Sequence, residues 1–264
     1  MSGLVPVLTI AGSDCSGGSG LEADLKTFTT HNTFGMCVVL NVVAVNTQRV
    51  LRIENMNADL VKDQFDAVFE DIPPKALKTG LMGNHENILI TIEKFKQYKP
   101  KNIVIDPVMF AKNGYRLISD DDFLLYKNEL IAYADVLTPN KLEAELLCGF
   151  EINNESTHKD ACKKLYDMGA RGVLVKGGKY FSDAVDIFYD GDDFIPIRTT
   201  RIETTNDHGA GCTLSASIAS NLALGFSKIE AVSKAKEYTR NAMLYAPALG
   251  KGRGPLNHMF NLFS

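Results

Sequence analysis

The sequence predicts an α/β fold, a three-layer αβα sandwich around a mostly parallel central sheet. Short runs of β-branched and apolar residues are nearly continuous rather than alternating, which is typical of strands buried on both faces of a parallel sheet. Longer stretches with apolar residues at helical period separate these runs, and this alternation favours right-handed βαβ units. The composition also indicates a globular protein, because 45% of the 264 residues are hydrophobic and 23% are charged.

The expected elements alternate along the first two thirds of the chain. We expect strands at residues 5–10, 37–45, 76–79, 103–105, 136–138 and 173–175. We expect helices at residues 59–70, 86–98, 121–134, 141–148 and 159–168, and one more directly after the loop of residues 11–20. No linker, internal repeat or low-complexity tract separates them in the sequence, so we predict one domain over residues 1–264.

The pattern changes near the end of the chain. We expect a hairpin of strands 185–189 and 194–198, followed by helices 209–224 and 227–245. Gly191 lies in the hairpin turn, and Gly225 ends the first of the two helices. Ser227 and Glu230 are spaced as a capping box, which predicts the start of the second helix.

The bulk properties point to small-molecule chemistry. A net charge of -4 leaves no basic footprint for a nucleic acid or a membrane surface. We see no signal peptide and no apolar run long enough to span a bilayer, so we expect a cytoplasmic protein. The five cysteines are odd in number and contain no C-x-x-C pair, which argues against a disulfide framework or a zinc site.

Residues 206–213, with the sequence NDHGAGCT, are the most informative segment. Gly209 and Gly211 stand at the start of an expected helix with an apolar face. Glycine lets the backbone approach a ligand closely, and consecutive N–H groups at a helix start form a nest for anions. The spacing therefore predicts a phosphate site, although a glycine-rich turn without a ligand fits the same pattern.

Two side chains in this segment are candidates for a catalytic base. Cys212 lies at the helix start, where we expect the partial positive charge to lower the thiol pKa and favour thiolate. The alternative is a small buried apolar side chain, the role of most free cysteines. Asp207 is the second candidate, with a solvated loop carboxylate as its alternative. Cys212 with His208 also allows a cysteine hydrolase, but no third orienting group is evident.

The loop of residues 11–20, AGSDCSGGSG, follows an expected strand and precedes a helix. This is the context of a ligand loop at the carboxyl edge of a sheet. Neither the G-x-G-x-x-G fingerprint nor a P-loop occurs in the chain, which excludes ordinary dinucleotide and P-loop sites. Asp24, early in the helix, faces the loop in this arrangement and is a candidate ligand contact, or simply a first-turn acid that favours the helix dipole.

Further polar residues follow other expected strands. Asp106 ends one strand, where a carboxylate points into the ligand crevice, and Lys176 follows another and precedes two glycines. Asn140 and Glu143 are spaced as a helix cap and its reciprocal partner, and spacing alone favours the cap. A nest, a base, two carboxylates and a lysine together form a set suited to phosphoryl transfer.

The motifs resemble the hydroxymethylpyrimidine and hydroxymethylpyrimidine-phosphate kinases of thiamine synthesis, in the ribokinase superfamily and close to the vitamin B6 kinases. The resemblance covers nearly the whole chain. It rests on LTIAGSDCSGGSG at 8–20, ADLKT at 23–27, KTGLMG at 78–83, IDPVM at 105–109, TPNKLEAELL at 138–147, VLVKGGK at 173–179, HGAGCTLSASIASNLALG at 208–225 and GRGPLNH at 252–258. It implies a ribokinase-like fold, ATP and Mg²⁺ as cofactors, and a homodimer.

The resemblance also implies roles for individual residues. An anion hole and base is implied for Gly209, Ala210, Gly211 and Cys212. A pyrimidine pocket is implied for Gly12, Asp24, Met82 and Val108, with Val45 at its edge. Contacts to Mg-ATP are implied for Asp106, Asn140, Glu143 and Lys176, with Asp106 and Glu143 on the metal. The implied reaction is phosphorylation of the hydroxymethyl group of 4-amino-5-hydroxymethyl-2-methylpyrimidine and of its monophosphate.

Two positions bear on the choice of substrate. Thiamine-type members of the family have the pattern A-Q-N-T where this chain has Ala44-Val45-Asn46-Thr47. The resemblance implies that the glutamine hydrogen-bonds the pyrimidine edge, and Val45 cannot make that bond. Some pyridoxal kinases of this type carry a second cysteine where this chain has Ala111, and the resemblance implies that such a cysteine captures the aldehyde. We favour the pyrimidine, because the loop of residues 12–20 and the helix at 208–225 resemble that family more closely, and we keep pyridoxine or pyridoxal kinase as the alternative. A binding protein that lost phosphoryl transfer is a third class, which magnesium-dependent ATP consumption would exclude.

Overall fold

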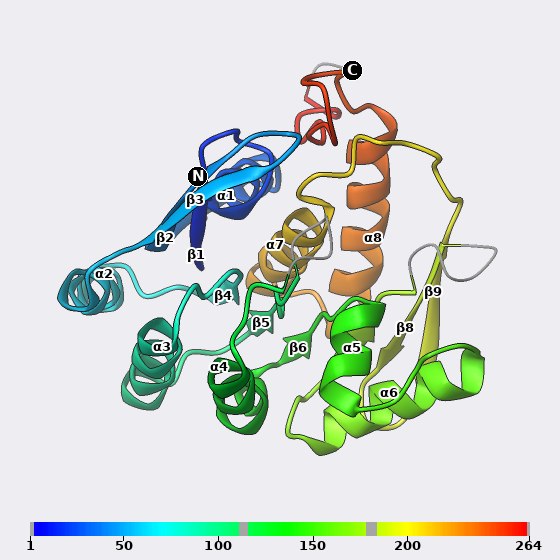
Figure 1. The fold of residues 1–264 in the computed structure, drawn as a ribbon, viewed down its shortest axis with the longest axis horizontal. Helices are drawn as coiled ribbons and strands as arrows, with labels where there is room; N and C mark the ends of the chain where they lie inside the picture. The colour runs from blue at the N-terminus through cyan, green and yellow to red at the C-terminus, as the bar shows by residue number, and fades with distance from the viewer. Residues whose placement is uncertain (1–2, 111–115, 178–183, 263–264) are drawn as a thin grey trace.

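A computed structural model describes residues 3–110, 116–177 and 184–262, so Ala111 lies outside the described residues. In chain order the elements are β1 (Val5–Asp14), α1 (Gly20–Thr30), β2 (Thr33–Val45), β3 (Val50–Asn55), α2 (Ala58–Asp71), β4 (Ala76–Thr79), α3 (His85–Tyr98), β5 (Ile103–Ile105), α4 (Asp120–Leu125), η1 (Tyr126–Leu130), η2 (Ile131–Tyr133), β6 (Val136–Leu137), α5 (Lys141–Cys148), α6 (Glu155–Asp167), β7 (Val173–Val175), β8 (Ala184–Tyr189), β9 (Phe194–Thr199), α7 (Ala210–Ala223) and α8 (Lys228–Leu244). Figure 1 shows their arrangement.

The described strands form one mixed sheet of nine, in the order β3-β2-β1-β4-β5-β6-β7-β8-β9. The six strands from β2 to β7 in this order pair in parallel. β3 pairs antiparallel with β2 at one edge, and the β8–β9 hairpin continues antiparallel from β7 at the other. The predicted parallel centre and C-terminal hairpin are confirmed.

Helices cover both faces of the sheet and make the expected three layers (Figure 1). One core cluster packs α2, α3, α5 and α6 against one face, with Phe65, Phe95 and Leu147 among its buried side chains. The other packs α1, α7 and α8 against the opposite face, around Phe28 and Ile218. The nearly continuous apolar runs of the central strands follow from this double burial, because no strand face is left for water.

Two strands are longer than predicted, since β1 runs on to Asp14 and β2 begins at Thr33, and the structure departs from the sequence prediction in three further places. β3 was not predicted, since its residues are mostly exposed at the sheet edge and carry no buried run. The expected helix at 121–134 changes pitch, because α4 is followed by a π-helical turn and then a 3-10 turn. Neither proline nor glycine occurs in that stretch, so the sequence gives no local signal for the change. α6 begins four residues before the predicted residue 159, where Asn154 and Thr157 form a capping box.

Several local predictions are confirmed. Ser227 with Glu230 caps α8, and Asn140 with Glu143 caps α5. All five cysteines lie in the described part of the chain, and all are free thiols. Among the described residues, no helix is long and apolar enough to cross a membrane.

Candidate active site

Polar side chains gather at the carboxyl edge of the parallel strands. Asp14 is the last residue of β1, Asp106 directly follows β5, and Lys176 directly follows β7. The loop of residues 206–209 leads into α7, which packs against β1, β4 and β5. The carboxyl ends of parallel strands meet at one edge of a sheet, so residues far apart in sequence are brought to one place.

The start of α7 has the geometry of an anion nest. Gly209 precedes the helix with φ 85°, a left-handed conformation that favours glycine. A Cβ atom on Gly209 would lie 1.9 Å from the carbonyl oxygen of Gly18, so a side chain is excluded there. The first amides of an α-helix have no carbonyl partner within the helix. In α7 the Ala210 amide donates to the Asp207 carbonyl at 3.2 Å, which leaves the amides of Gly211 and Cys212 for a ligand. This end of α7 is thus suited to a phosphate group.

Asp106 and Lys176 lie directly beside this nest. The Lys176 Nζ donates to Asp106 Oδ1 at 3.1 Å, and the same oxygen accepts from Thr138 Oγ1 at 3.1 Å. A Cβ atom on Gly211 would lie 3.5 Å from Asp106 Oδ2 and 3.6 Å from Lys176 Nζ. Burial would lower the pKa of Lys176, but the charges of Asp106 and Glu143 outweigh it and raise that pKa. The predicted phosphate-side residues are therefore brought together, and Lys176 is a cation.

Glu143 is buried behind this pair and acts as a capping residue. Its Oε2 accepts from the Asn140 amide at 2.8 Å, while Asn140 Oδ1 accepts from the Glu143 amide at 3.0 Å. Burial raises the pKa of Glu143 to about 7; Lys176 opposes this increase and Asp106 adds to it. The cap that spacing alone favoured is present. The described residues contain no group of three or more acidic, histidine or cysteine side chains that would hold a metal by themselves.

Asp24 lies in a wholly buried ion pair with Lys78. Both side chains are 0% exposed, and Lys78 Nζ donates to Asp24 Oδ2 at 2.8 Å. Thr9 Oγ1 donates to the same oxygen at 2.6 Å, whereas the buried Oδ1 of Asp24 has no hydrogen-bond partner. Burial would lower the pKa of Lys78, but the charges of Asp24 and its neighbours hold it above its ordinary value. Asp24 therefore faces Thr9 of β1 and Lys78 of β4 rather than the loop, and one of its carboxylate oxygens has no partner within the described protein.

The expectation of a lowered thiol pKa at Cys212 is wrong. Burial raises the pKa of Cys212, and the carboxylates of Asp24 and Asp106 raise it further. Lys78 opposes these effects and lowers it, without reversing the direction. Desolvation of the charged form outweighs the helix start here. Cys212 is consequently a protonated thiol at neutral pH in this structure.

Asp207, the second candidate base, is held by Arg253. The Arg253 guanidinium binds both carboxylate oxygens, with Nε donating to Oδ1 at 2.6 Å and Nη2 donating to Oδ2. A bidentate arginine stabilises the ionised carboxylate and so weakens it as a proton acceptor. The Asp207 carboxylate is therefore not the solvated loop group considered as its alternative.

The residues predicted to contact the ring lie in different surroundings. Met82 and Val108 line one small cavity together with Tyr126. Val45 ends β2, and its carbonyl accepts from the thiol of Cys15 at 3.3 Å, which ties it to the loop after β1. Gly12 sits at a register shift between β1 and β2, where a Cβ atom would lie 2.0 Å from the side-chain oxygen of Asn41. Gly12 thus makes room for another protein side chain.

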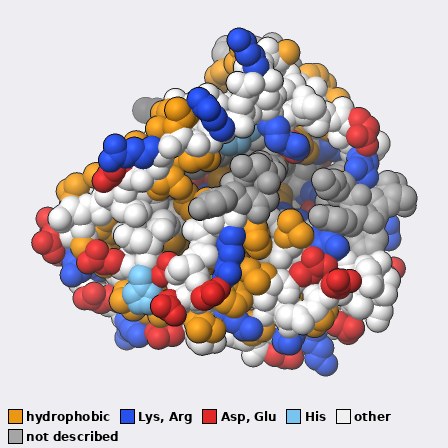
Figure 2. Space-filling view, viewed as in Figure 1, with side chains coloured by type: hydrophobic (Ala, Val, Ile, Leu, Met, Phe, Trp, Pro, Cys, Tyr) orange, Lys and Arg blue, Asp and Glu red, His pale blue; other side chains and the backbone are white. Residues whose placement is uncertain are grey.

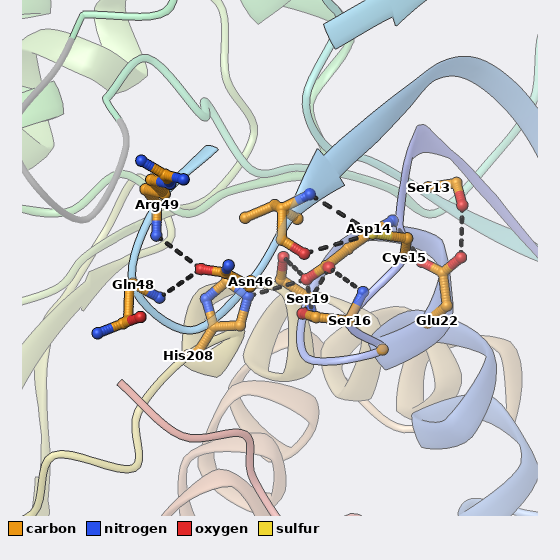
Figure 3. A network of polar contacts seen from close by, with 12 residues as sticks. Ser13, Asp14, Cys15, Ser16, Ser19, Glu22, Asn46, Gln48, Arg49 and His208 are labelled. Atoms are coloured by element: carbon orange, nitrogen blue, oxygen red, sulfur yellow. Dashed lines mark hydrogen bonds and ion pairs between the residues drawn. The ribbon is translucent and has the colours of Figure 1, made fainter. Parts of the chain in front are cut away.

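A polar network joins the loop after β1 to the nest loop. Figure 3 shows Asp14 surrounded by Ser16, Ser19 and His208. Asp14 Oδ2 lies 2.8 Å from His208 Nε2, and both carboxylate oxygens accept from serine amides and hydroxyls at 2.6 to 2.8 Å. Burial would raise the pKa of Asp14, but these hydrogen bonds outweigh it and hold the pKa well below its usual range. The network fixes the nest loop against the loop of residues 11–20.

Sequence reasoning missed two residues of this site. Lys78 is fully buried, and its signal was a charged residue in β4, a short strand whose other residues are uncharged. Asp14 lies in the glycine-rich loop, and its partner His208 is 194 residues away. Only the folded chain brings those two together, so spacing could not have found the pair.

Comparisons with known proteins give one consistent result. The family model for phosphomethylpyrimidine kinase matches residues 14–257. A hydroxymethylpyrimidine/phosphomethylpyrimidine kinase of Synechococcus elongatus is 40% identical over 263 residues, which cover 98% of this chain and 99% of that one. The thiamine biosynthesis bifunctional protein ThiED of Geobacter sulfurreducens is 42% identical over 96% of this chain. This chain spans about half of that longer relative, 52% of its length.

Solved structures of two kinds are similar to this fold. A phosphomethylpyrimidine kinase of Clostridium difficile superposes with a TM-score of 0.82 and 42% identity, covering 90% of this chain and 99% of that one. A pyridoxal kinase of Staphylococcus aureus in complex with AMP-PCP and pyridoxal superposes with a TM-score of 0.91 and 32% identity, covering 100% and 97% of the two chains. The ribokinase-like fold expected from the sequence is thereby confirmed.

Proposed function

The chain belongs to the phosphomethylpyrimidine kinase family, and from that premise we propose the reaction that it catalyses. It transfers the γ-phosphoryl group of ATP to the hydroxymethyl oxygen of 4-amino-5-hydroxymethyl-2-methylpyrimidine, and then phosphorylates the resulting monophosphate. This is a step of thiamine biosynthesis, as in the relatives named for it. The observation that carries the proposal is the convergence of the α7 nest, Asp106 and Lys176 at one point.

The geometry supports catalysis by positioning and charge stabilisation. In the transfer, a bond forms between the hydroxymethyl oxygen and the γ-phosphorus, and the bond from that phosphorus to the departing ADP breaks. Charge spreads over the transferred phosphoryl oxygens, so amide donors and a lysine already in place stabilise it without reorganisation. The amides of Gly211 and Cys212 and the ammonium of Lys176 fill these roles.

The hydroxyl proton leaves late in such a transfer, and Cys212 is the preferred acceptor. Asp207 is the weaker candidate because Arg253 holds both of its oxygens. Cys212 accepts a proton only as thiolate. Lys78 favours that form, whereas burial and the carboxylates of Asp24 and Asp106 oppose it, so bound substrate and ATP must shift the thiol toward thiolate. The unpartnered Oδ1 of Asp24 would accept from a ring amino group on the substrate side.

The residues beside the nest also fit a magnesium ion carried by ATP. Protein sites for Mg²⁺ commonly use one or two carboxylates together with substrate phosphates. Asp106 offers its Oδ2 toward the nest, and Glu143 stands behind it, although both Glu143 oxygens already accept from backbone amides. Bound Mg²⁺ would neutralise phosphate charge; Asp106 is the direct ligand in this proposal, and Glu143 supports it.

The deciding experiment compares Mg-ATP-dependent phosphorylation of hydroxymethylpyrimidine, its monophosphate, pyridoxine and pyridoxal in parallel. We expect kcat/KM to be highest for the two pyrimidines, since that ratio reports discrimination between substrates. Preference for the pyridines would move the protein to vitamin B6 salvage, which the superposition on the pyridoxal kinase keeps as the second candidate. ATP consumption with no acceptor turnover would contradict both.

The role of Cys212 has its own test. Cys212→Ala should lower kcat by roughly 10²- to 10⁴-fold, the usual effect of losing an acid–base group. Nucleotide binding should remain, as measured by calorimetry with a non-hydrolysable ATP analogue. Cys37→Ala is the matched control, because Cys37 is also partly buried but lies in β2. Full turnover in Cys212→Ala would show that this thiol is not the base.

The remaining predictions are also part of this proposal. One sheet and its two cores support a single domain over residues 1–264, and a cytoplasmic location stays a prediction.

A homodimer fits the edge strand β3, where Val50 and Leu51 are 42% and 59% exposed. Figure 2 shows hydrophobic side chains over this region. Analytical ultracentrifugation should give a mass twice that of one chain, and the Leu51→Lys variant should have the mass of a single chain.

A further inference from the structure

A segment of residues 250–254, which we name the glycine strap, lies between two walls of the site. On one side is the turn of residues 46–49, which directly follows Val45 at the end of β2. On the other is the nest loop of residues 206–209, which leads into α7. The strap comes from a part of the sequence that carries none of the groups assigned to the reaction.

Thr47 holds the strap to the turn. The amides of Lys251 and Gly252 both donate to Thr47 Oγ1, at 3.2 and 3.1 Å. The amide of Arg253 donates to the Thr47 carbonyl at 2.9 Å. Three consecutive amides are therefore satisfied by one residue that lies 204 to 206 positions earlier in the chain.

The glycines of the strap allow this close approach. A Cβ atom on Gly250, which has φ 83°, would lie 2.5 Å from the Thr47 side chain, and one on Gly252 would lie 2.1 Å from its carbonyl oxygen. A Cβ atom on Gly254 would lie 2.2 Å from Asn206 Oδ1. Every second residue of the strap thus presses on one of the two walls, and no side chain fits at these positions.

The other end of the strap holds the nest loop. The Arg253 guanidinium binds both oxygens of Asp207, and the carbonyl of Gly254 accepts from the His208 amide at 3.0 Å. Four residues further on, buried His258 lies 2.9 Å from Thr213 in the first turn of α7. Arg253 and Gly254 of the strap therefore contact the nest loop, and His258 contacts the helix that begins there.

We infer that Thr47 and Arg253 are positioning residues, which hold the ring-side turn and the phosphate nest in one fixed relation through the glycine strap. Neither residue is assigned to the reacting atoms. Their contribution is to keep the acceptor hydroxyl aligned with the phosphoryl group, and small misplacements of such groups lower rates strongly. The alignment role rests on the proposed function, whereas the physical coupling of the two walls does not.

The coupling is tested without activity, by hydrogen–deuterium exchange of the full-length chain. Thr47→Val keeps the β-branched shape and removes the oxygen that accepts from two amides. We expect faster exchange in the peptide covering residues 206–213, because the strap that holds it is released, and unchanged exchange in α6. Thr47→Ser should restore the native rate, and Thr29→Val, on the exposed face of α1, is the matched control. Unchanged exchange at 206–213 in Thr47→Val would overturn the coupling.

The alignment is tested by steady-state kinetics with Mg-ATP and hydroxymethylpyrimidine. Thr47→Val and Arg253→Met should each lower kcat by roughly tenfold, which corresponds to about 1.4 kcal/mol, with the KM for ATP unchanged. The double variant should be no slower than the slower single variant, because both changes release the same strap. If the losses in kcat of the two single variants add up in the double variant, or if they parallel a fall in melting temperature, the strap only stabilises the fold and does not align the site. If the wild type phosphorylates neither pyrimidine, the proposed function fails while the exchange result still decides the coupling.

Discussion

Two lysine–carboxylate pairs lie at the same edge of the sheet, and they are built differently. Lys78 and Asp24 are both 0% exposed, at 2.8 Å, and Thr9 adds a second donor to the bonded oxygen. Lys176 and Asp106 are 16% and 4% exposed, at 3.1 Å, with Glu143 behind them. The first pair is closed and balanced in charge. The second is partly open and gathers two carboxylates around one lysine.

The difference follows the chemistry expected on each side. A neutral ring needs one acceptor held at a fixed place, and the closed pair supplies it through the free Oδ1 of Asp24. A highly charged phosphate chain with a metal ion needs charges of both signs that remain accessible. Ion pairing thus serves as rigid support on one side and as an exchangeable contact on the other. The predictions below change the lysine of each pair, then Glu143 behind the second pair, then Val45 on the ring side, and ask whether the contrast holds.

The largest expected effect is on stability, from Lys78→Met. This change leaves Asp24 buried beside an uncharged side chain, which typically costs about 3–5 kcal/mol in the free energy of unfolding. Urea denaturation of Lys78→Met and Lys176→Met would compare the two pairs directly. The second variant should lose far less, since Lys176 is partly exposed. Equal losses would show that the two pairs do not differ in kind.

Catalysis should respond in the opposite order. Lys176→Met removes a cation aimed at the phosphate side, and we expect kcat to fall by roughly 10²- to 10³-fold, as when one preorganised donor to a developing charge is lost. The folded variant should keep its affinity for the pyrimidine, measured by calorimetry. Retention of wild-type kcat would remove Lys176 from the reaction and leave it a partner of Asp106 only.

The open cluster should also give stability a pH dependence. The Glu143 carboxyl has an ordinary pKa of 4.5 and one of about 7 in the folded protein. It binds its proton more tightly when folded, so its contribution to stability is present below pH 4.5 and is lost as pH rises through about 7. Glu143→Gln cannot ionise and keeps an oxygen for the cap. Relative to wild type, it should gain about 3 kcal/mol between those limits, and a pH-independent difference would contradict the shift.

The smallest expected effect concerns the ring side. Val45→Gln restores an amide at the end of β2, near the loop that carries Cys15. A new hydrogen bond to the pyrimidine edge is worth roughly 1 kcal/mol, or about fivefold in kcat/KM. Pyridoxal, measured in the same assay, should not gain. An equal gain for both substrates would mean that position 45 does not read the ring.

The sequence predicted the parts of the site that lie on single segments. The nest at 209–212, the carboxylate after β5 and the lysine after β7 follow from glycine spacing and strand ends, and the structure places them together. The thiol pKa of Cys212 was predicted in the wrong direction, because local position at a helix start says nothing of burial. Lys78 was missed as a partner of Asp24, since their pairing spans 54 residues.

The same holds for the fold, in which the elements with a local sequence signal were predicted and the others were missed. Strands with apolar runs and helices with caps were found, because each carries its signal within ten or fifteen residues. β3 was missed although Leu51-Arg52-Ile53-Glu54 alternates apolar and polar residues, because this exposed edge strand has no continuous apolar run like those of the central strands. The change of pitch after α4 has no proline or glycine to mark it.

The glycine strap has a consequence for synthesis of the protein on the ribosome. Contacts that complete the site join residues 194 and 205 positions apart, from Asp14 to His208 and from Thr47 to Gly252. Chains are made from the N-terminus, so the sheet has most of its strands before these contacts can form. A nascent chain that already contains every proposed catalytic group still lacks the strap. Full enzyme activity should therefore appear only after residues near 254 have left the exit tunnel, and chains stalled before that point should turn over at least about tenfold more slowly than the complete chain.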